Sequence, residues 1–292
     1  MISIIIASVD EVMLAEVTEN ITETIGLPFE ILSYSNSKGE AGLCSIYNKG
    51  SKAAKYKILC FMHEDLHIKT DNWGKVVVDA FQDQKLGIIG VVGSSYKTCA
   101  PTGWYTISYE NKVLHGNYIQ SFKYSNRPSE HFNENPLNQK MAPVVSVDGM
   151  WFCTTKALSE EFPFDEEVFK GFHCYDLDFC FQVGQAYKIA VNYQILIEHY
   201  SEGNFNKIWW LDTLKLHQKW RNKLPISVTD ITAKQRFLIE KRSYRWVIET
   251  LRKIGYSGAY VFAFLIKQKM NGSLSWLQYL KAMKYMLRTP KI

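Results

Sequence analysis

The chain has 292 residues, of which 47% are hydrophobic and 22% are charged. This balance is ordinary for a folded globular protein and excludes a wholly disordered chain. The length allows one large α/β domain and a smaller appendage. The longest mainly apolar stretch, from Ile254 to Ile266, is too short to span a bilayer.

The cysteines and the N-terminus predict a cytoplasmic protein. The six cysteines show no CxxC pair and no metal-ligand spacing. Cys60 and Cys153 lie in strand-like runs, where a free cysteine behaves as a small buried hydrophobe. The chain enters an apolar run directly at Ile2, with no basic leader before it.

The net charge of +5 is unevenly distributed. Residues 226–292 hold 13 Lys and Arg against 3 Asp and Glu, whereas the rest of the chain holds 21 basic and 26 acidic residues. This basic tail is either a solvated helical face, a surface attracted to the inner face of an anionic membrane, or an oligomerisation or lid element. No recognised nucleic-acid motif accompanies the charge, so a nucleic-acid partner is not expected.

Short apolar runs alternate with helical patterns over the first 200 residues, which predicts an α/β fold with a mostly parallel sheet flanked by helices. The runs that favour strands are 2–7, 29–34, 57–63, 86–92, 144–152 and 187–192. The segments with helical spacing are 11–25, 43–54 and 73–83.

The segment from Gly93 to Met141 breaks this rhythm and predicts long loops, with a hairpin over 104–115 that turns at Glu110-Asn111. Loops of this length inside an α/β domain are usually functional. After Pro225 the pattern is helical and basic. We therefore expect a catalytic-type α/β domain over 1–225 and a basic helical extension over 226–292.

Acidic residues follow the third predicted strand, in the run His63-Glu64-Asp65. Side chains at the carboxyl end of a strand in an open α/β sheet face the ligand crevice. Carboxylates there can hold a divalent cation, and the cation can neutralise a diphosphate. Taken alone, such a pair is more often a helix cap or a solvated turn.

Two later segments carry further candidate groups. Asp148-Gly149 precedes an apolar run, and Asp176 and Asp178 open a helical pattern, where they either complement the helix dipole or supply a catalytic base. His199 follows the last strand, where a histidine is either a surface group or a ligand for a transition metal.

Taken in order, these pieces resemble the family-2-type glycosyltransferases of GT-A fold, in particular the streptomycin-biosynthesis glycosyltransferase-like branch. The resemblance covers Ile2 to about Pro225. It is carried by Ile4-Ile5-Ile6-Ala7-Ser8, Ser45-Ile46-Tyr47-Asn48-Lys49-Gly50, His63-Glu64-Asp65, Val147-Asp148-Gly149, Tyr175-Asp176-Leu177-Asp178 and His199.

The resemblance implies roles for individual residues. Asp65 matches the last carboxylate of the family's metal motif, and His199 matches a late histidine that completes the site in some relatives. Asp176 matches the base that deprotonates the acceptor hydroxyl. The chain departs from the family at His63, where a carboxylate is common, and at Tyr175, where Glu is common. Contacts with the nucleotide sugar are expected at Ser8, Asp10, Asn36, Asn48, His63, Glu64, Asp148, Gly149 and Asp178.

The implied activity is inverting transfer of a sugar from a nucleoside-diphosphate sugar to a hydroxyl of a saccharide or lipid-linked acceptor, assisted by Mn²⁺ or Mg²⁺. A single displacement needs one base, Asp176, and no protein nucleophile. The alternative is a non-catalytic sugar- or nucleotide-binding module with a degenerate metal motif. A nucleotidyltransferase is disfavoured because no glycine follows the first strand in Ser8-Val9-Asp10-Glu11.

Aromatic residues suggest an acceptor cleft. Trp104 and Tyr105 in the long loop and Trp151 after Gly149 are candidates for stacking on sugar rings. For Trp209 and Trp210, packing in a core is at least as good an explanation, because adjacent aromatics on a helix usually place one inside.

Overall fold

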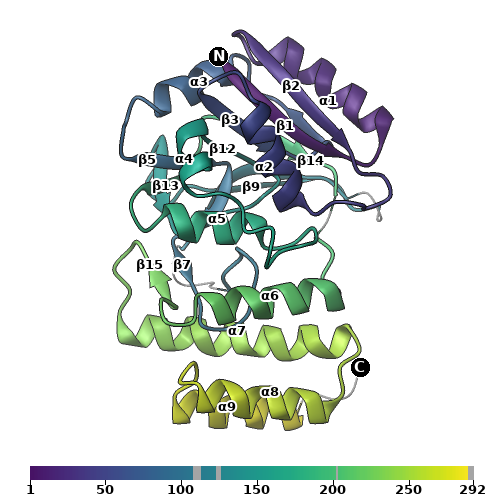
Figure 1. Cartoon of the computed structure of the whole chain (residues 1–292). Coiled ribbons are helices and arrows are strands. Elements are labelled where there is room, and N and C mark those ends of the chain that lie inside the picture. Colours follow the sequence, from purple (N-terminus) through teal and green to yellow (C-terminus); the bar gives the residue numbers. More distant parts are fainter. Residues whose placement is uncertain (108–112, 123–125, 202, 289–292) are drawn as a thin grey trace. The chain divides into compact units, whose positions relative to one another are not determined.

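The computed structural model describes residues 1–107, 113–122, 126–201 and 203–288. The chain forms two compact units (Figure 1). The first unit comprises Met1–Ser95 and Leu114–Gly203, and the second comprises Tyr96–Val113 and Asn204–Ile292. The predicted hairpin turn at Glu110-Asn111 lies outside the described residues, and residues 104–107 form no strand.

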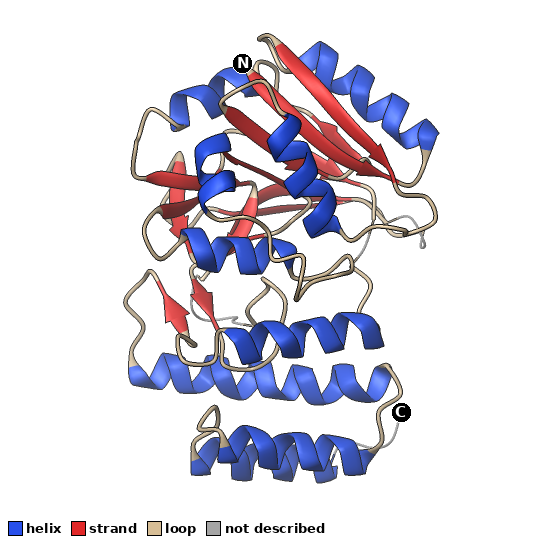
Figure 2. Cartoon of the chain, in the orientation of Figure 1, coloured by secondary structure: helices blue, strands red, loops and turns tan. Residues whose placement is uncertain are grey.

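The first unit is built on a seven-stranded sheet in the order β10-β13-β5-β12-β3-β1-β2. Figure 2 shows the strands of the chain in red and its helices in blue. Its strands are β1 (Ile2–Ser8), β2 (Phe29–Ser35), β3 (Ile58–Met62), β5 (Leu86–Gly90), β10 (Met141–Val144), β12 (Trp151–Thr155) and β13 (Lys188–Asn192). Ile4, Ile5 and Ile6 of β1 are fully buried. A strand buried on both faces reads as a continuous apolar run, as β1 does.

The sheet is mixed rather than mostly parallel. Strand β1 is parallel to β2 and β3, and β13 is parallel to β5. Strand β12 enters between β3 and β5 and runs antiparallel to both, and β10 runs antiparallel to β13. Trp151, at the start of β12, pairs with Met62, at the end of β3. The loop before β12 therefore lies at the carboxyl end of β3.

Helices pack on this sheet, and the predicted α/β fold with a sheet flanked by helices is confirmed. The helices of the first unit are α1 (Glu11–Thr24), α2 (Leu43–Ala53), α3 (Trp73–Ala80), α4 (Lys156–Glu161) and α5 (Tyr175–Val183). Asp10 caps α1 by accepting hydrogen bonds from Val12 N and Met13 N. Helix α2 lies close on β1, since a Cβ at Gly50 would lie 2.6 Å from Ile5 Cγ2.

A second sheet in the first unit has the order β11-β6-β8-β14-β4, with β9 paired to β8. Its strands are β4 (Leu66–Ile68), β6 (Val92–Ser94), β8 (Leu114–Gln120), β9 (Glu130–Glu134), β11 (Ser146–Val147) and β14 (Ile197–His199). Asn20 of α1 fixes β4, because its side chain donates to Ile68 O at 3.1 Å and accepts from Ile68 N at 2.7 Å.

This second sheet corrects two predictions. The segment 93–141 is not a run of long loops, since it supplies β8 and β9, which pair antiparallel from Gly116 with Glu134 to Gln120 with Glu130. The apolar run 144–152 is not one strand. It contains the last residue of β10, the short strand β11 and the first residues of β12. Alternating polarity was too weak in both segments to reveal the break.

The second unit is mainly helical, as predicted for the tail. Its helices are α6 (Lys207–Lys219), α7 (Ala233–Lys253), α8 (Gly258–Met270) and α9 (Trp276–Arg288). All four contribute to one apolar core that includes Trp210, Val247, Leu265 and Met286. Thr232 and Gln235 form a reciprocal capping box at the start of α7.

A segment from within the first 225 residues also belongs to the second unit. Strand β7 (Tyr96–Lys97) pairs antiparallel with β15 (Ile226–Ser227). The buried carboxylate of Glu240 accepts hydrogen bonds from Tyr96 Oη at 2.8 Å and from Cys99 N at 2.9 Å. The compact units divide at residues 95, 113 and 203, and the domain boundary near residue 225 stays a prediction from the sequence pattern.

Two further observations concern the whole chain. All six cysteines are free, and five of them are buried. Among the described residues, no helix combines the length and the apolar character that crossing a bilayer requires.

Trp210 tests the core of the second unit. Its side chain is 0% exposed, its indole Nε1 donates to Tyr260 Oη at 2.9 Å, and its ring lies 5.3 Å from that of Phe264. Trp210→Ala should lower the free energy of unfolding by about 3–5 kcal/mol in urea titrations followed by circular dichroism. Ile208→Ala, at an exposed position of the same helix, should change it by less than about 0.5 kcal/mol. Equal effects of the two variants would contradict this packing.

Candidate functional site

Strand pairing brings Asp65 and His199 together. Asp65 lies between β3 and β4, and His199 ends β14. Because β14 runs antiparallel to β4 with His199 opposite Leu66, the backbone of Tyr200 donates to Asp65 O at 3.0 Å. The pairing of two short strands thus brings together two residues that lie far apart in the sequence.

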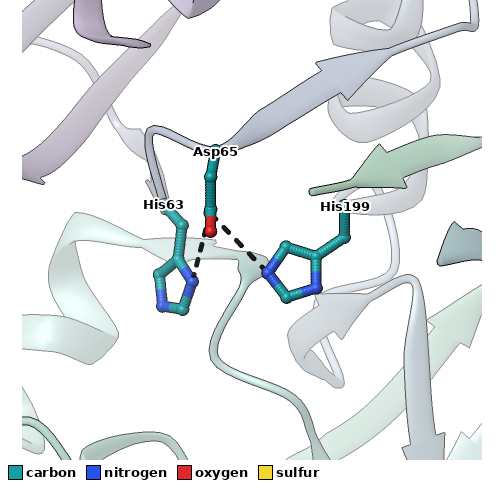
Figure 3. A group of neighbouring side chains, drawn as sticks. All are labelled: His63, Asp65 and His199. Carbon is teal, nitrogen blue, oxygen red and sulfur yellow. Dashed lines mark ion pairs between the residues drawn. The ribbon is translucent and has the colours of Figure 1, made fainter. Parts of the chain in front are cut away.

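His63, Asp65 and His199 form a cluster of metal-ligating side chains (Figure 3). Asp65 Oδ1 lies 3.8 Å from His63 Nδ1 and 3.6 Å from His199 Nε2, and one ligand atom from each residue lies within 4.8 Å of the others. Asp65 Oδ1 is buried and accepts no hydrogen bond from any described residue. A buried acceptor left in this state is costly unless a cation or proton donor satisfies it.

The tautomer of His63 follows from its hydrogen bonds. His63 Nε2 lies 3.0 Å from Tyr175 Oη, and Tyr175 Oη donates to the carbonyl oxygen of Gly149 at 3.1 Å. With the Tyr175 proton directed to Gly149 O, a carbonyl that can only accept, the Tyr175 oxygen accepts from His63 Nε2–H. The Tyr47 side chain is a further hydrogen-bond partner of Tyr175. His63 Nδ1 then directs a lone pair toward Asp65, as in a metal-ligating histidine whose other nitrogen is held by a hydrogen bond.

The charge states suit metal ligation. Burial lowers the pKa of His63, against the opposing influence of Asp65 and Glu64. Burial acts to raise the pKa of Asp65, but His63, His199 and a hydrogen bond from Ser201 hold it below its usual range. A neutral imidazole and an ionised carboxylate are the forms that bind metals. Two facing acceptors with no proton between them fit a divalent cation.

The loop 148–150 lies beside this cluster. His63 N donates to Met150 O at 2.9 Å, and Asp148 Oδ1 accepts from Met150 N at 2.8 Å. Gly149 is required where it stands, because a Cβ there would lie 2.2 Å from Tyr175 Oη. The structure thus brings Asp148 and Gly149 to the same end of the sheet as His63.

Asp176 is the second residue of α5 and directly follows Tyr175. Burial, and then the charge of Asp148, raise its pKa to about 7, although backbone hydrogen bonds from Leu177, Asp176 and Gly149 oppose the shift. Two carboxylates close enough to repel each other hold one proton readily near neutral pH. Asp176 therefore directly follows in sequence the tyrosine whose hydroxyl contacts His63 of the cluster.

Ser8, Asp10 and Glu64 meet at the ends of β1 and β3. Glu64 Oε1 accepts from the backbone N–H groups of Val9 at 2.9 Å and Asp10 at 3.1 Å. Glu64 Oε2 is buried and has no hydrogen-bond partner among the described residues. Ser8 is buried, and its carbonyl accepts from Asn36 N. These residues form a polar edge at the carboxyl end of the sheet.

Three predicted contact residues are engaged by the protein itself. The amide of Asn36 closes its own loop, donating to Ala41 O at 2.9 Å and accepting from Ala41 N at 3.1 Å. Asn48 likewise makes two hydrogen bonds with the backbone of Phe164: it donates to Phe164 O and accepts from Phe164 N, at 2.9 Å each. Asp178 is 1% exposed and accepts from Gln182 at 2.8 Å. Their side chains serve local structure and are not gathered with the cluster.

Sequence reasoning missed the residues that organise the site. In the sequence Tyr175 stands out only as a departure from the family, yet its hydroxyl contacts both His63 and Gly149. Ser201 lies 3.2 Å from His199 Nε2. The exposed ring of Phe172 lies 5.6 Å from that of His63. The run Gly171-Phe172-His173 showed an aromatic residue in a loop, but no local pattern marked its neighbours.

The aromatic residues expected to line a cleft have other locations. Trp151 is fully buried and packs edge-on against Trp73, so it is not available for sugar stacking. Trp209 and Trp210 lie in the core of the second unit, which agrees with the packing explanation. Trp104 and Tyr105 belong to the second unit as well.

Comparison with known proteins identifies the family. The model of a glycosyltransferase-like family matches residues 3–224. The chain belongs to this family. Membership confirms the resemblance to family-2-type glycosyltransferases, whereas the streptomycin-biosynthesis branch stays a prediction. The matched range ends close to residue 225, where the sequence pattern changes.

Other similarities of this glycosyltransferase are distant. No curated protein sequence matches it. Among solved structures, GalNAc-T7 with UDP, GalNAc and Mn²⁺ is similar with a TM-score of 0.47 at 9% identity, over 68% of this chain and 44% of that chain. A197 from STIV is similar with a TM-score of 0.39 at 11% identity, over 69% of this chain and 86% of that chain. The chain thus spans less than half of the GalNAc-T7 chain.

Asn48 distinguishes a structural role from a nucleotide-binding one. Asn48→Ala leaves the buried N–H and C=O groups of Phe164 without their partners, which should lower the free energy of unfolding by about 2 kcal/mol. Affinity for a nucleoside diphosphate, measured by calorimetry, should not change. Asn36→Ala, which removes the same kind of bonds from a surface loop, should cost less. If Asn48→Ala leaves stability unchanged but weakens nucleotide binding, then Asn48 contacts the nucleotide.

Proposed function

We propose that this glycosyltransferase transfers a sugar from a nucleoside-diphosphate sugar to a hydroxyl of a saccharide or lipid-linked saccharide, with metal assistance and inversion at the anomeric carbon. The observation that supports this most is the cluster of His63, Asp65 and His199, which can hold a divalent cation. Tyr175 contacts His63 of this cluster, and the next residue in the chain is Asp176 with its raised pKa.

The ligand set favours Mn²⁺ over Mg²⁺. Mg²⁺ prefers oxygen ligands in octahedral geometry, whereas imidazole nitrogen suits transition metals. Two imidazoles and one carboxylate are offered by His63, Asp65 and His199. A cation held there would supply Lewis-acid neutralisation of the charge that develops on a departing diphosphate. Tyr175 is a positioning residue in this proposal, because it holds His63 in the tautomer that presents Nδ1.

Metal binding can be measured without catalysis. Mn²⁺ titrations followed by electron paramagnetic resonance should give a single site that Asp65→Ala and His199→Ala abolish, with weaker binding of Mg²⁺. Tyr175→Phe should weaken Mn²⁺ binding by about 10- to 100-fold, because the His63 tautomer is no longer fixed. His67→Ala is the matched control, since His67 is exposed on β4 and lies outside the cluster. Full Mn²⁺ affinity in Asp65→Ala would exclude this site.

Asp176 is the proposed general base. Its carboxylate would accept the proton of the acceptor hydroxyl as that oxygen attacks the anomeric carbon, and a pKa near the working pH is the most effective for such a transfer. Asp148 contributes by keeping that pKa raised. Attack from the face opposite the leaving diphosphate, with no protein nucleophile, inverts the anomeric configuration.

The remaining residues suggest where the other parts of the substrates bind. The polar edge formed by Ser8, Asp10 and Glu64 is the proposed contact for the nucleoside, with the unpaired Glu64 Oε2 as an acceptor for a hydroxyl group. Phe172 exposes its ring beside His63, and the C–H face of a sugar would pack on it. Both assignments place substrate at the carboxyl ends of the central strands.

The pH dependence tests the base. Only ionised Asp176 can accept a proton, so kcat/KM should rise with pH and level off above about 7. Asp148→Asn removes the like charge, lowers the pKa of Asp176 and should move this rise to lower pH. Asp176→Asn should reduce turnover by a factor of about 10² to 10⁴ while Mn²⁺ affinity and thermal stability are retained. Full turnover by Asp176→Asn with its true substrates would eliminate Asp176 as the base.

A further inference from the structure

Helix α9 carries an unusual concentration of exposed apolar side chains. Trp276, Leu280 and Leu287 are 67%, 58% and 76% exposed. Spaced by four and seven residues, they lie along one side of the helix. The opposite side, with Ala282 and Met286, packs in the core of the second unit. Helix α9 is therefore packed on the second unit through one face, and the apolar stripe lies on its exposed face.

A row of cations lies beside this stripe. Lys281, Lys284 and Arg288 recur three and four residues apart, and α9 contains no acidic residue. Together with Arg245 and Tyr285 they line a depression of about 260 Å³. The buried Nε of Arg245 has no hydrogen-bond partner among the described residues. A cationic depression next to an apolar stripe is suited to a phosphate group that carries apolar chains.

A further cation lies at the start of the stripe. Lys269, near the end of α8, lies with its Nζ 4.7 Å from the centre of the Trp276 ring. Helices α8 and α9 lie side by side (Figure 1). Tryptophan and lysine are the residues that favour the boundary between lipid headgroups and acyl chains, since each has an apolar body and a polar end.

We propose that α9 lies in the surface of an anionic membrane, with Trp276, Leu280 and Leu287 among the acyl chains and the cations of the depression on lipid phosphates. The combination of an apolar stripe and adjacent Lys and Arg residues is that of an in-plane amphipathic helix. Residues 226–292 carry a large excess of basic residues, which adds attraction to anionic lipids.

The occupant is a membrane rather than a second copy of the chain. Contact between two α9 helices would bring the cations of both copies together, and like charges repel. Helix α7 is also rich in basic residues, and its apolar residues include Tyr244 and Ile248. Those two side chains are buried in the core, so α7 offers no apolar stripe to a bilayer.

Vesicle flotation tests this proposal with the full chain. Binding should occur with vesicles rich in phosphatidylglycerol, fall with added salt, and be much weaker with phosphatidylcholine alone. Leu280→Ser/Leu287→Ser should weaken binding at least about tenfold. Lys281→Gln/Lys284→Gln should weaken it by roughly fivefold for each charge and reduce its dependence on salt.

The control variants distinguish binding through α9 from nonspecific binding to vesicles. Ile208→Ser removes an exposed apolar side chain elsewhere in the second unit, and Lys223→Gln/Lys253→Gln removes two exposed charges. Ile208→Ser should bind vesicles like the wild type, and Lys223→Gln/Lys253→Gln should weaken binding less than Lys281→Gln/Lys284→Gln does. The proposal is overturned if the chain does not float with anionic vesicles, if both α9 variants bind normally, or if ultracentrifugation shows a dimer that the leucine variant abolishes. Since Mn²⁺ binding does not involve α9, failure here leaves the proposed function standing.

Discussion

The hydroxyl group of Tyr175 connects His63 to the loop that contains Gly149. It donates to Gly149 O and accepts from His63, so one oxygen fixes both the loop before β12 and the orientation of an imidazole. Tyr175 itself is buried at the start of α5. The position of that helix relative to the end of β3 is thus set by the same contact that decides which nitrogen His63 presents. Gly149 is the necessary partner, because any side chain there would occupy the place of the hydroxyl.

This arrangement leaves several acidic atoms in a poor environment. Asp65 Oδ1 and Glu64 Oε2 are buried without hydrogen-bond donors among the described residues, and Asp148 and Asp176 repel each other. Interiors normally satisfy such groups, and exceptions concentrate at functional sites. The protein therefore retains an electrostatic cost at this end of the sheet. The cation and substrates of the proposed function would relieve that cost.

The sequence predicted the parts of the fold that depend on local pattern. The isoleucines of β1, the periodicity of α1 and the acidic turn after β3 were sufficient to find those elements and their approximate ends. The antiparallel insertion of β12 was not predictable, because an apolar run does not indicate whether its strand is parallel or antiparallel to its neighbours. The same limit applies to the site. Asp65 and His199 were found through family order, but Tyr175 acts across a distance in sequence that no local pattern records. The role of Asn48 stays a prediction, because a buried amide that bonds backbone resembles in sequence one that binds a ligand.

The interleaving of the two units has a consequence for how this chain can be divided. Residues 96–113 lie within the family-matched range but fold with helices that come after it. A chain cut at residue 225 would keep Tyr96 and Cys99 and lose Glu240, the acceptor for both. Such a truncation removes most of the packed core of the second unit, including Val247, Leu265 and Met286. Strand β7 and helices α7 to α9 thus belong to one folding unit, although the family-matched range separates them in sequence.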